Sequence, residues 1–78
     1  MFPRNEVHTL YTESGFACVE FILFPNTEEV QVQTYGTKFC KQDLKSWLAP
    51  NAPAQYLTKE HARRVYADYL AKGYGKRG

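Results

Sequence analysis

The sequence predicts an α+β fold in which a three-stranded antiparallel meander is followed by two helices that pack on one face of the sheet. Two observations predict this order. The first half holds runs rich in β-branched and aromatic residues, with period-two alternation of apolar and polar residues at 29–35, and apolar residues recur at helical spacing in the second half. The chain has 78 residues, which is the length of one domain. We expect that domain to span residues 1–73, with residues 74–78 as a short, basic, flexible tail.

The strands are predicted from runs rich in β-branched and aromatic residues, which cover residues 7–13, 16–24 and 29–35. Ser14 and Gly15 suit a two-residue turn between the first two runs, because glycine adopts positive φ at no steric cost. Residues 25–28 (PNTE) form the second turn. Gly36 is expected to end the third strand. Such short connections place neighbouring strands antiparallel.

These turns predict a register in which Leu10 faces Val19, and Cys18 faces Tyr35. Because side chains alternate between the two faces of a strand, each face of the sheet collects a defined set of residues. The face expected to be the core, covered by the helices, collects His8, Leu10, Thr12, Ala17, Val19, Phe21, Leu23, Val30, Val32 and Thr34. The opposite, mixed face collects Val7, Thr9, Tyr11, Cys18, Glu20, Ile22, Phe24, Gln31, Gln33 and Tyr35.

The mixed face predicts a surface that binds another protein or a second copy of the chain. An antiparallel sheet commonly leaves one face in water, and an exposed patch that contains aromatic residues is typical of an interaction surface. Aromatic residues also stabilise a solvated face by pairing across strands, which is the competing interpretation. The residues expected to bind the partner are Tyr11, Glu20, Ile22, Phe24 and Tyr35.

The first helix is predicted from Cys40, Leu44, Trp47 and Leu48, which fall at positions i, i+4, i+7 and i+8. Pro50 would end this helix. On this prediction Trp47 is the central packing residue between the helices and the sheet. The segment 50–55 is then expected to be a stiff loop, because it contains two prolines.

The second helix is predicted to begin after Thr58, a good N-cap residue, and to end at Gly73, which suits a left-handed C-cap. Glu60 lies in the first turn, where a carboxylate interacts favourably with the helix dipole. An apolar stripe at helical spacing faces the sheet and consists of Ala62, Val65, Tyr66, Tyr69 and Leu70.

The net charge of +2 conceals an uneven distribution. Residues 1–36 carry one basic and five acidic residues, whereas residues 37–78 carry nine basic and three acidic residues. This asymmetry indicates either a polyanionic partner or attraction between the two halves. The alternative function is therefore nucleic-acid binding. The competing interpretation is a solvated helix face with local ion pairs. The pI of 8.6 is also below the value above 9 that is usual for nucleic-acid-binding domains. The residues expected to contact nucleic acid are Lys59, Arg63, Arg64, Lys72, Lys76 and Arg77.

No pattern of reactive residues predicts catalysis or a cofactor. A zinc site or a cysteine–histidine nucleophile would have to use Cys18, Cys40, His8 and His61, and these residues lack the paired spacing of such sites. We expect both cysteines to be reduced thiols. The sequence thus predicts no enzyme, no metal and no cofactor.

The longest apolar run, residues 16–24, is nine residues long, whereas a membrane-spanning helix needs about 20. The N-terminal residues do not show the basic and then apolar pattern of a secretory signal. We therefore expect a cytoplasmic protein without membrane contact. The leading hypothesis is a small non-enzymatic protein-binding module of the adaptor, regulator or inhibitor type.

Overall fold

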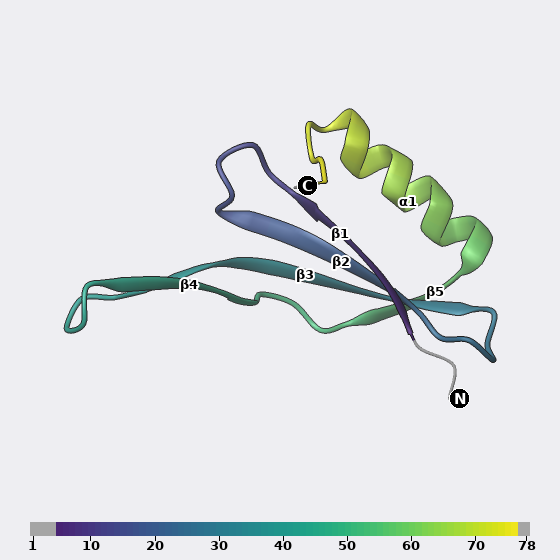
Figure 1. Ribbon diagram of the computed structural model, residues 1–78, viewed down its shortest axis with the longest axis horizontal. Helices are drawn as coiled ribbons and strands as arrows, with labels where there is room; N and C mark the ends of the chain where they lie inside the picture. Colours follow the sequence, from purple (N-terminus) through teal and green to yellow (C-terminus); the bar gives the residue numbers. More distant parts are fainter. Residues whose placement is uncertain (1–4, 77–78) are drawn as a thin grey trace.

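The computed structural model describes residues 5–76 and shows an α+β fold, with one antiparallel sheet and one C-terminal helix (Figure 1). The strands are paired in the order β1-β2-β3-β4, and β5 also pairs with β3. The elements are β1 (Glu6–Tyr11), β2 (Ala17–Leu23), β3 (Glu29–Cys40), β4 (Lys45–Pro50), β5 (Gln55–Thr58) and α1 (Lys59–Ala71).

The meander of β1, β2 and β3 confirms the predicted strands and their register. Leu10 pairs with Val19, and Cys18 pairs with Tyr35. The turn between β1 and β2 contains Gly15 at a φ of 78°, a conformation that glycine adopts without strain. The predicted division of residues between the two faces of these strands follows from this register.

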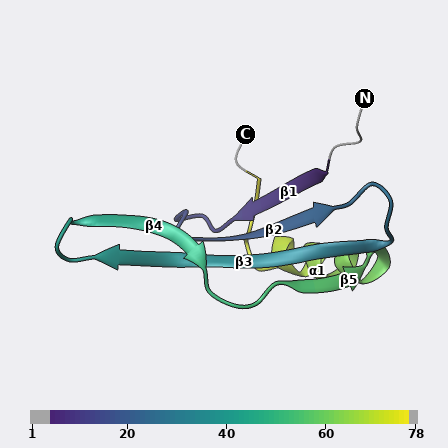
Figure 2. The ribbon, with the colours of Figure 1, turned by 90° about the horizontal axis from the view of Figure 1, so that it is seen from below.

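β3 is longer than predicted and continues through Gly36 to Cys40. Its outer edge pairs with two strands in succession: β5 pairs with the beginning of β3, and β4 pairs with its end (Figure 2). The link between β4 and β5 stays close to β3. The backbone N–H of Asn51 donates to the carbonyl of Thr34 at 3.2 Å, and the side-chain amide of Gln33 donates to the carbonyl of Ala52 at 2.7 Å.

The helix predicted from Cys40 to Leu48 is wrong, because this segment is the end of β3, a turn and β4. The alternation of β3 begins at Glu29 and continues past Gly36 to Cys40. Gly36 therefore lies inside a strand, and its contact with Asn51 explains why. A Cβ atom at Gly36 would lie 3.1 Å from Nδ2 of Asn51, so glycine permits this close approach. Trp47 lies on β4 and is 48% exposed, so its predicted central packing role is also wrong. The predicted loop 50–55 is too long at both ends, since Pro50 is the last residue of β4 and Gln55 is the first residue of β5.

α1 confirms the second predicted helix. The hydroxyl of Thr58 accepts a hydrogen bond from the backbone N–H of His61 at 3.2 Å, and Gly73 follows the helix at a φ of 100°. Among the residues described, α1 is the only α-helix. The core lies between α1 and the sheet and consists of Leu10, Val19, Phe21, Val30, Val32 and Ala62.

The first residues of the segment predicted as a flexible tail lie against the fold. Gly75 and Tyr11 exchange two backbone hydrogen bonds of 2.8 and 2.9 Å, and the ring of Tyr74 packs edge-on against Tyr69 at 4.9 Å between centroids. Arg77 and Gly78 of that segment lie outside the described residues.

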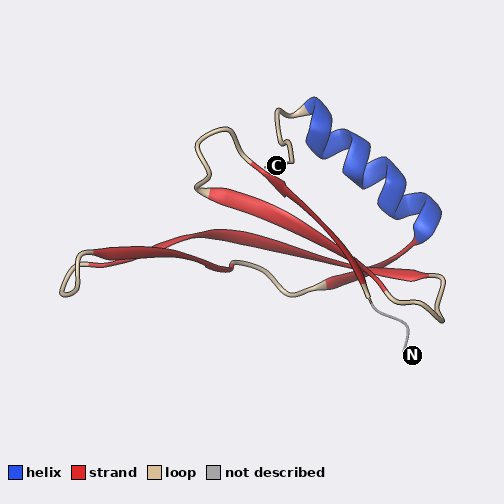
Figure 3. Ribbon diagram, viewed as in Figure 1, coloured by secondary structure: helices blue, strands red, loops and turns tan. Residues whose placement is uncertain are grey.

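The molecule is elongated because the hairpin of β3 and β4 projects beyond the part of the sheet that α1 covers (Figure 3). We call this hairpin, residues 36–50, the arm. The radius of gyration is 14.1 Å, against about 11.5 Å for a compact domain of this length. Within residues 5–76, no helix is long and apolar enough to cross a membrane.

Candidate functional site

The sheet has one face covered by α1 and one face without a covering element among the described residues (Figure 1). We call the second one the open face. The register assigns to it side chains from all five strands: Val7, Thr9, Tyr11, Cys18, Glu20, Ile22, Glu29, Gln31, Gln33, Tyr35, Thr37, Phe39, Ser46, Leu48, Pro50, Tyr56 and Thr58.

Four of the predicted partner-binding residues lie together on this face. Tyr11, Glu20, Ile22 and Tyr35 come from three adjacent strands and are all half-buried. Phe24 is also half-buried and follows the last residue of β2. The predicted register therefore placed Tyr11, Glu20, Ile22 and Tyr35 on the correct face of the sheet.

Large apolar side chains are exposed on the open face. In the described chain, eight large hydrophobic residues are exposed, and four of them occupy strand positions on this face: Val7 (50%), Phe39 (57%), Leu48 (36%) and Tyr56 (60%). Val7 and Tyr56 lie in one cross-strand row with Ile22 and Gln31, whereas Leu48 and Phe39 lie further along β3, in the arm. A folded monomer buries such residues where its own elements can cover them, and apolar residues gathered on one exposed face are typical of an interaction surface.

Phe39, Leu48 and Tyr56 were missed as site residues by the sequence analysis. Phe39 continues the alternation of β3, and this period was the one signal that could have identified it. The other two residues belong to β4 and β5, which were predicted as helix and loop. The arm therefore enlarges the predicted surface beyond the three-stranded meander.

A small polar network lies at the centre of the open face. The hydroxyl of Tyr35 donates to Oε1 of Glu20 at 3.3 Å. Burial, and then the negative charge of Glu20, raises the pKa of the buried Cys18 thiol above its ordinary value. Burial also raises the pKa of Tyr35, and its bond to the carboxylate acts in the same direction. Both groups are therefore neutral at physiological pH.

The charge of the open face is acidic. Its strand positions carry the carboxylates of Glu20 and Glu29, and none of these positions holds Lys or Arg. The basic residues lie instead on the helix side of the sheet, where β3 and β4 contribute Lys38 and Lys45. The two sides of the sheet thus differ in charge.

The predicted nucleic-acid-binding residues are divided among different environments. Arg64 lies 3.6 Å from the carboxylate of Glu60, both exposed, and Lys72 lies over the ring of Tyr69 at 5.2 Å. Arg77 lies outside the described residues. The remaining three, Lys59, Arg63 and Lys76, come together at one pocket.

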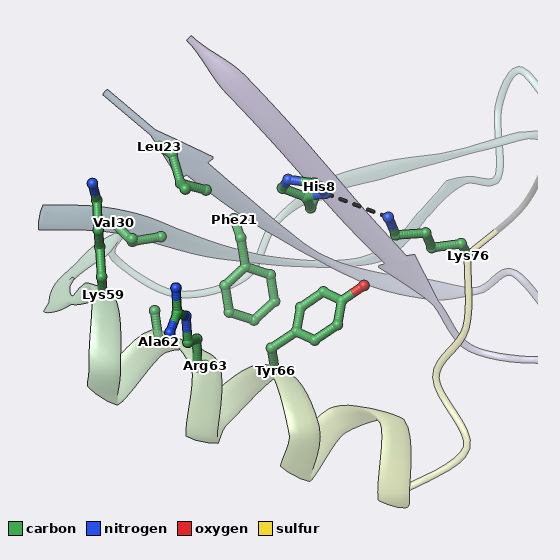
Figure 4. Close-up of a pocket in the computed structure, with 9 residues that line it drawn as sticks. All are labelled: His8, Phe21, Leu23, Val30, Lys59, Ala62, Arg63, Tyr66 and Lys76. Carbon is green, nitrogen blue, oxygen red and sulfur yellow. Dashed lines mark hydrogen bonds between the residues drawn. The ribbon is translucent and has the colours of Figure 1, made fainter. Parts of the chain in front are cut away.

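This pocket has a volume of about 450 Å³ and lies between α1 and the helix-side face of β1, β2 and β3 (Figure 4). We call it the basic pocket. Its apolar part is lined by Phe21, Leu23, Val30, Ala62 and the ring of Tyr66. Its titratable or charged lining residues besides Tyr66 are His8, Lys59, Arg63 and Lys76.

His8 connects two charged groups at the edge of the basic pocket. Its Nδ1 lies 3.4 Å from Nζ of Lys76, and its Nε2 lies 2.8 Å from Oε1 of Glu6. A lysine ammonium only donates, so Nδ1 accepts from Lys76, and Nε2–H donates to the carboxylate.

The structure gives no sign of a metal centre in the part of the chain it describes, because no three His, Cys, Asp or Glu side chains come together there. Cys18 and Cys40 are both free thiols. The thiol of Cys40 lies in the arm, 3.8 Å from the carboxylate of Asp43.

No protein-family model, no curated protein and no solved structure matches this chain.

Proposed function

We propose that this protein is a protein-binding module that docks on its partner through the open face and the arm. The observation that carries the proposal is the placement of Val7, Phe39, Leu48 and Tyr56, exposed and apolar, on the face that α1 does not cover. Apolar surface removed from water contributes about 25 cal/mol per Å². A partner that covers this face would supply that contribution.

The elongated shape supports the proposal. The accessible surface is 6072 Å², against about 4,900 Å² for a compact monomer of this mass. The arm is an extended two-stranded hairpin at one end of the molecule (Figure 2). An isolated hairpin is marginally stable in water, so a partner packed against the arm would stabilise it.

The charges on the open face indicate the chemistry of the partner. Glu20 and Glu29 are the charged groups at its strand positions, and two copies docked by the same face would bring these carboxylates toward one another. Like charges at an interface are unfavourable. We therefore propose a different protein, whose apolar binding surface is edged by Lys or Arg side chains.

Nucleic acid is a less suitable partner for this face. Proteins that bind single strands on a sheet combine aromatic side chains with a positive field. The open face has the aromatic residues, but its strand positions lack Lys and Arg. Binding through α1 instead, with Arg63 and Arg64, is the competing outcome of the test below.

The test compares two variants with matched chemistry. Phe39→Ser with Leu48→Ser changes the open face, and Leu70→Ser is the control, because Leu70 is 46% exposed on α1. A partner captured from a nuclease-treated cell extract is purified, and its affinity for each variant is measured by calorimetry. We expect the double variant to weaken binding by at least about 30-fold, as for residues at the centre of an interface, and the control to bind like the unchanged protein.

Equal affinities of the double variant and the unchanged protein would contradict the proposal. So would capture that is abolished by nuclease and depends on Arg63 and Arg64. A monomer–dimer equilibrium that the double variant shifts toward the monomer would replace the heterologous partner with a second copy of the chain. Circular dichroism must show that each variant retains the fold of the unchanged protein.

A further inference from the structure

We propose that the basic pocket binds a small organic anion with an apolar body, such as an alkyl or aryl carboxylate. The pocket lies on the side of the sheet opposite the open face, so this site is independent of the proposed protein interface (Figure 4). Its volume of about 450 Å³ lies within the range of about 300–1,000 Å³ that is usual for small-molecule sites.

The apolar part of the pocket is well defined by the core. Phe21, Val30 and Ala62 are each at most 5% exposed, and Phe21 is fixed by an edge-on contact with Tyr66 at 5.3 Å between centroids. Ala62 has a short side chain at the position of α1 that faces the sheet, so these three residues form the closed floor of the pocket, and Leu23 and Tyr66 line it as partly buried residues. A ligand tail placed there would exchange water for apolar contacts.

The charged part of the pocket selects the sign of the ligand. Lys59 and Arg63 are four residues apart on α1 and rise from the helix on one side, whereas His8 and Lys76 lie together on the other (Figure 4). No Asp or Glu from residues 5–76 lines the pocket; the carboxylate of Glu6 contacts His8 from outside it. An apolar pocket whose charged edge residues are the cations Lys59, Arg63 and Lys76 is complementary to a negative head group on an apolar body.

Arg63 is the residue that we assign to the head group. Its guanidinium presents paired N–H donors that match the two oxygens of a carboxylate. The neighbouring Arg64 is occupied differently, because it is exposed and lies 3.6 Å from Glu60. The two arginines therefore form a matched pair, with equal charge and adjacent positions, of which one lines the pocket.

The experiment measures binding of sodium decanoate by calorimetry and by the methyl resonances of the labelled protein. We expect decanoate to bind, and decanol and decylammonium, which have the same tail, to bind at least tenfold more weakly. Shortening the carboxylate should weaken binding by about fourfold for each methylene group buried. The methyl groups of Leu23, Val30 and Ala62 should shift, and those of Val7 and Ile22 on the open face should not.

Two variants test the role assigned to Arg63. Arg63→Gln should weaken decanoate binding at least tenfold, whereas Arg64→Gln should leave it within twofold of the unchanged protein. Equal binding of decanol and decanoate, shifts confined to the open face, or equal effects of the two variants would overturn the proposal. Binding of inorganic phosphate as tight as that of decanoate would also overturn it, because the apolar part would then contribute nothing. None of these outcomes depends on whether the open face binds a protein.

Discussion

The hydroxyl of Tyr35 on β3 donates a hydrogen bond to Oε1 of Glu20 on β2, over 3.3 Å. The two residues are diagonal neighbours, because Tyr35 pairs with Cys18, and Glu20 pairs with Gln33. This contact places a phenol, a carboxylate and a buried thiol side by side at the centre of the open face. The ionisation of the Cys18 thiol and of the Tyr35 phenol is therefore coupled to folding.

The first prediction concerns stability at alkaline pH. The pKa of the Cys18 thiol is raised by burial and by Glu20 from an ordinary value of 9.0, so the thiolate forms more easily in the unfolded chain. The contribution of Cys18 to the free energy of unfolding should be fully present below pH 9, and it should be lost as the pH rises from 9 through the raised pKa. Urea titrations at a series of pH values would measure this loss.

Cys18→Ala should reduce this pH dependence, and Cys40→Ala should leave it unchanged. Tyr35, whose pKa is raised from 10.0, adds a further fall above pH 10. A free energy of unfolding that rises with pH in this range would contradict the assignment.

The second prediction tests the position of Trp47. Trp47 is 48% exposed on the arm, whereas Leu10 is fully buried in the core. Trp47→Ala should lower the free energy of unfolding by about 1 kcal/mol or less, and Leu10→Ala by about 2–5 kcal/mol. Chemical denaturation gives both values. A loss at Trp47 as large as that at Leu10 would indicate a buried tryptophan and a different arm.

The third prediction concerns Gly36. A Cβ atom there would lie 3.1 Å from Nδ2 of Asn51, and Asn51 is held by a 2.6 Å hydrogen bond from the hydroxyl of Thr34. Gly36→Ala should therefore destabilise the fold by about 1 kcal/mol. Gly75→Ala is the control, since a Cβ atom there meets nothing within 4 Å. In an Asn51→Ala background the effect of Gly36→Ala should disappear, and persistence of the full loss would exclude this contact as its cause.

The fourth prediction concerns the tip of the arm. Leu44 has a φ of 54° and is 78% exposed, and this left-handed conformation costs an L-residue about 1–2 kcal/mol. Leu44→Gly should raise the free energy of unfolding by about 0.5–1 kcal/mol, because glycine removes this cost but has more entropy to lose. Leu44→Ala should bring no gain. Thermal unfolding compares the three proteins, and equal stability of the glycine and alanine variants would be evidence against the strained turn.

The meander and α1 could be predicted from the sequence because their signals are local and agree with one another. Gly15 fixes the first turn, and Thr58 and Gly73 mark the two ends of the helix region. The arm could not be predicted from the sequence, because the spacing of Cys40, Leu44 and Trp47 is compatible with a helix as well as with a hairpin. Short apolar runs leave this ambiguity. Its turn also holds leucine where glycine or asparagine would have indicated a hairpin.

Within the candidate site, the residues of the meander could also be predicted from the sequence, whereas those of β4 and β5 and the basic pocket could not. Tyr11, Glu20, Ile22 and Tyr35 follow from the register of the meander, so the sequence placed them on the open face. Leu48 and Tyr56 depend on β4 and β5, which reach β3 only through long-range pairing. The basic pocket depends on the distance between α1 and the sheet, which no sequence pattern expresses.

The central claim is that the open face binds a protein, and methyl resonances test it most directly. The purified partner is titrated into the methyl-labelled protein, and shifts are compared between the two sides of the sheet. We predict shifts at Val7, Ile22 and Leu48, with Leu70 and Val65 of α1 unchanged. Shifts confined to Leu70 and Val65, with the open-face methyl groups unaffected, would contradict the claim.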